Sequence, residues 1–209
     1  MRIAGRRTDQ HWAMLKQRLL LEPNESLWQQ AFDQYYQTRI NTRYLKPIDS
    51  IRRHDTRNGE GFAIVALFCS LLEFLESCER GYNFHFIGRS NDSLQPYEYN
   101  ERQASSYFKD FLRTRKPFDR LVPSALVNSF YKDVRCGLLH EARTKGDWYI
   151  STAKSNGVLI SQESGKITLF RNQLTPALEI YFEDYQSRLL NDQNTQAAFV
   201  RKFDFLCQH

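Results

Sequence analysis

The sequence predicts a mainly-α protein: an up-and-down helical bundle with a small antiparallel β meander inserted before the last helices. Apolar residues recur at spacings of three and four over most of the 209 residues, as on the buried face of a helix. Short β-prone runs separated by glycine-containing turns interrupt this pattern once, between residues 148 and 170. The length suits one sizeable core or, less readily, two small ones, and we expect one domain, residues 1–209.

Two amphipathic helices are expected first. Thr8 can cap a helix that ends at Pro23, and its buried face would carry Trp12, Leu15 and Leu19. A second helix should span residues 25–45 and stop before Pro47, because proline disfavours helical backbone in the residue before it. From Pro47 to Gly61 the chain is polar and basic, which predicts a loop.

Residues 62–78 form the central helix of the predicted bundle, because they are apolar on nearly every side. Glu73 and Glu76 near its end are the charged residues that depart from this pattern. A long loop should follow over residues 79–99, then a helix over 101–115. A fifth helix is expected to begin near Pro123, which suits a first helical turn.

The β meander is predicted from three runs, at residues 148–152, 158–161 and 166–170. Ser155-Asn156-Gly157 and Glu163-Ser164-Gly165 separate these runs and are typical of turns. Thr175-Pro176 then begins another helix, and a last amphipathic helix covers residues 195–206.

The composition of the chain narrows the classes of function that we expect for this protein. A net charge of +5 leans towards an anionic partner, although the basic residues are spread along the chain. Four cysteines without C-x-x-C spacing predict a reducing cytoplasm, and no segment reads as a signal peptide or a membrane span. No glycine-rich phosphate loop, G-x-S-x-G or Cys/His zinc pattern is present, so we expect neither cofactor nor metal.

Arg135 and His140 are the candidate catalytic residues, because they join a permanent cation to a group that moves protons near neutral pH. In RNA cleavage without a metal, the 2′-hydroxyl attacks the adjacent phosphate. That reaction needs a proton acceptor, a proton donor and a cation that offsets charge on the phosphorane. His140 could move the protons and Arg135 could bind the phosphate, whereas DNA would not be cut.

On a straight helix, five residues separate Arg135 and His140 by roughly 140°, so they do not share one face. They could converge if Gly137 loosens the helix, if His140 lies on a frayed last turn, or if the long arginine reaches round. A two-fold dimer, in which each site draws on both chains, is the route we favour. Small Cys136 and Gly137 would permit that close approach.

Neighbouring residues could support the chemistry. Lys132, Arg143 and Lys145 would add a basic surface for the RNA backbone. Asp133 or Glu141 could orient the imidazole.

A purely structural explanation competes with this one: Arg135 pairs with an acid such as Glu73, His140 ends a helix, and Gly137 marks a tight packing contact. The same Arg/His spacing recurs at Arg6/His11, in an N-terminus expected to be frayed, and at Arg80/His85 near a helix end. His54 with Asp55 and the neighbouring arginines could bind phosphate, but a solvated basic loop is the explanation we favour.

The segment from Val134 to Glu141, following a helix that ends Leu72-Glu73-Phe74-Leu75-Glu76, resembles the HEPN superfamily of helical proteins, whose motif is Arg, four to six residues, then His. The resemblance implies a HEPN-like bundle, a metal-independent endoribonuclease, and a homodimer with a composite site. It also implies a toxin or antiviral defence effector with RNA as its partner, and an antitoxin or other defence-system protein as a second partner. Arg135 and His140 occupy the motif positions.

Two other hypotheses stay open. Cys136 follows the motif arginine where active members often carry a polar residue, so the chain could be a non-catalytic HEPN-like module that binds nucleic acid or protein. It could also be an assembly subunit whose aromatic helix faces are buried in an oligomer.

Overall fold

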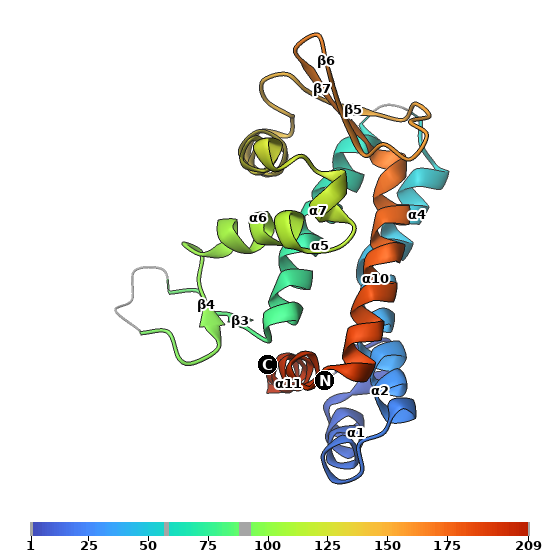
Figure 1. The fold of residues 1–209 in the computed structure, drawn as a ribbon, viewed down its shortest axis with the longest axis vertical. Helices are drawn as coiled ribbons and strands as arrows, with labels where there is room; N and C mark the ends of the chain where they lie inside the picture. The colour runs from blue at the N-terminus through green and yellow to red at the C-terminus, as the bar shows by residue number, and fades with distance from the viewer. Residues whose placement is uncertain (1, 57–58, 88–92, 209) are drawn as a thin grey trace. The chain divides into compact units, whose positions relative to one another are not determined.

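The computed structural model describes residues 2–56, 59–87 and 93–208 (Figure 1). Its chain divides into two compact units. Unit 1 comprises Met1–Lys46, Ser77–Gln103 and Glu183–His209, and unit 2 comprises Pro47–Glu76 and Ala104–Phe182. Helices make up most of the described chain, so the mainly-α class with small β elements is confirmed. That the whole chain is one domain stays a prediction.

Unit 1 begins with a short hairpin rather than a frayed end. Strand β1 (Arg2–Ala4) pairs antiparallel with β2 (Arg7–Thr8), and the side chains of Ile3 and Ala4 are buried. The expectation of a frayed N-terminus was therefore wrong, because these two apolar residues anchor it. Helix α1 (Asp9–Leu21) follows, and it is capped at Thr8 as predicted.

The second predicted helix continues past Pro47, so the predicted end before Pro47 and the loop over its first residues were wrong. Its consecutive segments are α2 (Glu25–Ala31), the π-helix η1 (Phe32–Gln37), α3 (Thr38–Ile40), the π-helix η2 (Asn41–Leu45) and α4 (Lys46–Arg53). A proline in a helix clashes with the carbonyl of residue i−4. Here that residue is Arg43, which lies in the wider π-helical turn, and this accommodates Pro47.

Aromatic rings fill the core of unit 1. The ring centroids of Trp12 and Tyr35 are 5.2 Å apart, and Tyr36 stacks on Tyr185 at 4.6 Å. Helix α10 (Leu174–Asn191) supplies Tyr185 from its unit 1 part, and α11 (Gln193–Gln208) supplies Phe199 and Phe203. The core therefore depends on segments from both ends of the chain.

Helix α5 (Glu60–Arg80) is the predicted central helix. It is the one helix of the described chain that is long and apolar enough to cross a membrane, but 56% of its apolar window is buried inside the protein. A helix that is apolar all round can also be the core helix of a protein outside the membrane, which passes the same test of length and composition. In the loop predicted over residues 79–99, β3 (Asn83–Phe84) pairs parallel with β4 (Glu98–Tyr99), and residues 88–92 lie outside the described chain.

Unit 2 packs short helices against its part of α5. They are α6 (Ala104–Thr114), α7 (Phe118–Leu121), the 3₁₀ helix η3 (Ser124–Leu126), α8 (Val127–Ser129), the π-helix η4 (Phe130–Arg135) and α9 (Cys136–Glu141). Phe111 contacts both Phe118 and Tyr181 with its ring. Phe130 stacks on Trp148, which fixes the helix that carries Arg135 against the small sheet.

The three predicted strands form β5 (Trp148–Ser151), β6 (Ile160–Glu163) and β7 (Lys166–Phe170), but their order is β5-β7-β6 (Figure 1). The predicted all-antiparallel meander was wrong in this respect, because β5 runs parallel to β7. A two-residue turn, Ser164-Gly165, with positive φ at both positions, joins β6 to β7 as a hairpin. The longer 152–159 connection lets β5 reach the other edge of β7.

Candidate functional site

Arg135 is the last residue of the π-helix η4, and His140 lies in the last turn of α9. The predicted fifth helix therefore contains a π-helical turn that ends at the candidate arginine. Single π-helical turns within α-helices occur frequently at functional sites. No feature of the sequence indicated this turn.

The guanidinium of Arg135 pairs with Glu73 of α5. Its Nη2 lies 3.4 Å from Glu73 Oε2, and the side chains are 22% and 18% exposed. The guanidinium also lies 5.5 Å from the ring centroid of Tyr131, at cation–π distance. The Arg135–Glu73 pair that the structural alternative predicts is thus present.

This pair uses one of the N–H donors of the Arg135 guanidinium and leaves the others without a hydrogen bond within the described chain. An arginine has five N–H donors, and the bond to Glu73 is the one side-chain hydrogen bond of Arg135 within the described chain. Arg115 of unit 2 differs: its Nε and Nη2 donate to both carboxylate oxygens of Glu76, at 2.9 and 3.0 Å. Arg135 therefore keeps donors that a phosphate could use.

Burial governs the electrostatics beside Arg135. Burial raises the pKa of Glu73, and the neighbouring Arg135 offsets only part of that rise. Burial likewise raises the pKa of Tyr131 and brings the pKa of the Cys69 thiol on α5 to about 12. Cys69 is therefore a neutral core thiol at physiological pH.

His140 is exposed to solvent. Among residues 2–56, 59–87 and 93–208, no hydrogen bond or ion pair joins it to Arg135. Both residues belong to one short helical stretch, where α-helical rotation places them roughly 140° apart. One chain therefore presents both groups without bringing them into contact.

Four of the supporting residues, Asp133, Glu141, Arg143 and Lys145, contact one another rather than His140 within the described chain. Glu141 pairs with Lys145 and with Arg143, whose Nη2 lies 3.2 Å from a carboxylate oxygen, and Lys145 lowers the pKa of Glu141. The Asp133 carbonyl accepts a hydrogen bond from the Lys145 N–H at 2.8 Å. No hydrogen bond within the described chain links His140 to Asp133 or Glu141. Their role in orienting the imidazole, like a role of exposed Lys132 in binding RNA, stays a prediction.

Gly137 has a structural reason to be glycine. A Cβ built on it would lie 2.5 Å from the carbonyl oxygen of Arg143, closer than side-chain carbons come to backbone oxygens. The chain after α9 folds back onto this position, as the Lys145–Asp133 hydrogen bond also shows. The tight packing contact expected for Gly137 is confirmed.

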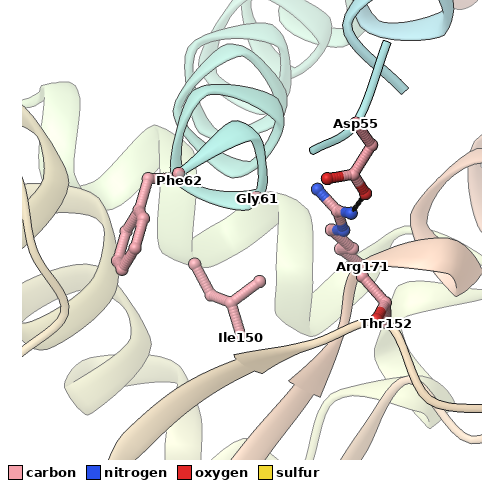
Figure 2. Close-up of a pocket in the computed structure, with 7 residues that line it drawn as sticks. Asp55, Gly61, Phe62, Ile150, Thr152 and Arg171 are labelled. Atoms are coloured by element: carbon pink, nitrogen blue, oxygen red, sulfur yellow. Dashed lines mark hydrogen bonds and ion pairs between the residues drawn. The ribbon is translucent and has the colours of Figure 1, made fainter. Parts of the chain in front are cut away.

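His54 and Asp55, the second candidate pair, contact other residues of the fold. Asp55 forms an ion pair with Arg171 of the 3₁₀ helix η5 (Arg171–Gln173). The side chain of Arg171 is 4% exposed. The pair lines a pocket with Gly61, Phe62, Ile150 and Thr152 at the start of α5, and Figure 2 shows the guanidinium turned to the carboxylate. The His54 Nδ1 lies 2.8 Å from the Ser50 carbonyl oxygen.

Comparisons of this chain with protein-family models, curated proteins and solved structures find no match. The resemblance to the HEPN superfamily thus rests on the residues around Arg135 and His140.

Proposed function

We propose that this protein is a cytoplasmic, HEPN-like, metal-independent endoribonuclease, active as a homodimer and acting as a toxin or defence effector. One observation carries the proposal. An exposed imidazole and a guanidinium with uncommitted donors lie on the same short helical stretch, with a π-helical turn at the arginine. An antitoxin or another defence-system protein is the expected second partner.

In this mechanism Arg135 binds the scissile phosphate. Glu73 holds one nitrogen of the guanidinium and so limits its rotation, while the remaining donors face the phosphate oxygens. His140 takes the proton of the 2′-hydroxyl or gives one to the leaving 5′-oxygen. The negative charge that develops on the phosphorane is offset by the guanidinium.

A second copy of the chain completes the site. Since ideal helical rotation separates Arg135 and His140 by about 140°, we expect the imidazole that serves each arginine to come from the other chain. Exposed Leu139, next to His140, gives this surface an apolar residue that a dimer would cover.

Replacing His140 tests the chemistry. We expect His140→Ala to abolish cleavage of single-stranded RNA in chelator-containing buffer, and to change the free energy of unfolding by less than about 0.5 kcal/mol because the residue is exposed. His54→Ala is the matched control, since it also removes an exposed imidazole from unit 2. Retained cleavage by His140→Ala, or equal cleavage of DNA, would exclude the mechanism.

Mixing two inactive variants tests the composite site. A heterodimer of Arg135→Ala and His140→Ala chains would contain one intact site and one site lacking both groups. An equal mixture should therefore recover about a quarter of wild-type activity. A mixture as inactive as its components would place both groups of each site in one chain.

A second function is favoured by the Arg135–Glu73 pair and by Cys136: a non-catalytic HEPN-like module that binds nucleic acid or protein. In that function Glu73 neutralises the arginine, and the basic residues after α9 provide the affinity. It predicts salt-sensitive RNA binding that is unchanged in His140→Ala. New RNA ends after long incubation with the pure wild-type protein would contradict it.

A further inference from the structure

A second basic site lies in unit 1, between the N-terminal hairpin, α1 and the π-helix η1. A cavity of about 160 Å³ opens there. Arg7, His11, Met14, Leu15, Arg18, Gln30, Gln34 and Tyr35 line it.

The cavity is positively charged and lacks an acidic lining residue. Arg7 and Arg18 make no ion pair with any described residue, and Arg7 is half-buried. The arginine of the pocket in Figure 2 differs, because Arg171 is already paired with Asp55. Two uncompensated arginines on one cavity attract an anion.

Tyr35 supplies an independent indication. Its side chain is fully buried in the core, yet its hydroxyl has no hydrogen-bond partner among the residues that the structure describes. An unsatisfied buried hydroxyl costs about 1–3 kcal/mol, so such groups normally have a partner. Tyr35 belongs to the π-helix η1 and lines the cavity, so a bound oxyanion could accept this hydrogen bond.

We propose that this cavity binds a phosphate group. Arg7 and Arg18 would bind its oxygens through their planar forks, and the Tyr35 hydroxyl would donate a further hydrogen bond. A phosphate monoester matches the two uncompensated charges better than a carboxylate, because it carries about −1.5 to −2 at neutral pH.

The remaining lining residues suit the group attached to that phosphate. Met14 and Leu15 offer apolar surface, and the amides of Gln30 and Gln34 offer both donors and acceptors. A nucleotide has this combination, either free or as the end of an RNA strand. The site lies wholly in unit 1 and requires neither Arg135 nor His140.

Calorimetric titration of the full chain with inorganic phosphate, adenosine 5′-monophosphate and a short 5′-phosphorylated RNA tests the proposal. We expect the monophosphate or the RNA to bind, and inorganic phosphate to compete. Arg7→Gln and Arg18→Gln should each weaken binding about tenfold. Arg6→Gln is the matched control, because it removes the same charge from an exposed neighbour that does not line the cavity.

Tyr35→Phe separates binding from folding. Removing the hydroxyl should weaken binding about threefold and leave the free protein at least as stable, since the hydroxyl has no hydrogen bond to lose within the described part of the chain. Binding of the monophosphate indicates a free nucleotide as the ligand, whereas binding of the RNA alone indicates a strand end. Absence of phosphate binding, or equal weakening by Arg6→Gln, would overturn the proposal.

His140→Ala distinguishes failure of this proposal from failure of the proposed nuclease. That variant should bind the phosphate ligand as the wild type does, whatever happens to RNA cleavage.

Discussion

Helix α5 carries two glutamates three residues apart, and each meets an arginine of unit 2 in a different way. Glu76 is fully buried and accepts two hydrogen bonds from Arg115, whereas Glu73 accepts one, at 3.4 Å, from Arg135. The first pair satisfies both carboxylate oxygens, and the second leaves donors uncommitted. The comparison indicates that Arg115 belongs to the fold, while Arg135 can also take part in binding.

Breaking the pair of Glu76 with Arg115 should have the largest effect on the free energy of unfolding. Glu76→Gln removes the charge of a fully buried carboxylate that the Arg115 guanidinium contacts, so we expect unfolding to become easier by about 3 kcal/mol. Urea denaturation measures this. A loss below about 1 kcal/mol would mean that Arg115 finds solvent instead, and the contrast with Arg135 would disappear.

Arginine-to-lysine replacements compare the two pairs directly. Lysine keeps the charge but cannot make a two-point contact. Arg115→Lys should therefore lower the free energy of unfolding by about 1–2 kcal/mol, and Arg135→Lys by less than about 0.5 kcal/mol. The order of the two losses is the decisive measurement. Equal losses would show that Arg135 is as firmly held as Arg115.

The smallest expected effect is the pH dependence of Glu73. Its pKa is raised in the folded protein, so ionisation of Glu73 disfavours folding as pH rises above the unfolded value of about 4.5. Glu73→Gln should match the wild type near pH 4 and gain stability relative to it by pH 7, by less than about 1 kcal/mol. Unfolding curves at both pH values measure the difference. A relative loss at pH 7 would show that the ion pair with Arg135 outweighs the burial of Glu73.

Regular patterns in the sequence predicted most helices, but not where local geometry departs from the ideal. The helix through Pro47 was missed because the π-helical turn before it has no sequence signature. The β7 boundaries were predicted correctly, whereas the parallel pairing of β5 depends on how the 152–159 connection crosses the sheet. Strand direction is set by such connections rather than by residue preferences.

For the candidate site, the sequence indicated the helix and the Arg135–Glu73 pair, but not how many donors the pair uses. Contacts between distant residues, such as Asp55 with Arg171, had no local signal. The cavity beside Tyr35 had a partial signal in the sequence. His11, Leu15 and Arg18 lie at spacings of four and three on α1, so a basic residue at each end of an apolar face could have drawn attention to it.

The division of the chain has a consequence for its biosynthesis. Unit 2 is complete once Phe182 has left the ribosome, whereas unit 1 must wait for the segment that begins at Glu183. Until then Trp12 lacks Phe199 and Phe203, whose rings lie 6.0 and 5.5 Å from it in the folded protein. The apolar face of α1 therefore stays without these partners until α11 has been made, and chaperones that shield nascent apolar segments would cover it in the meantime.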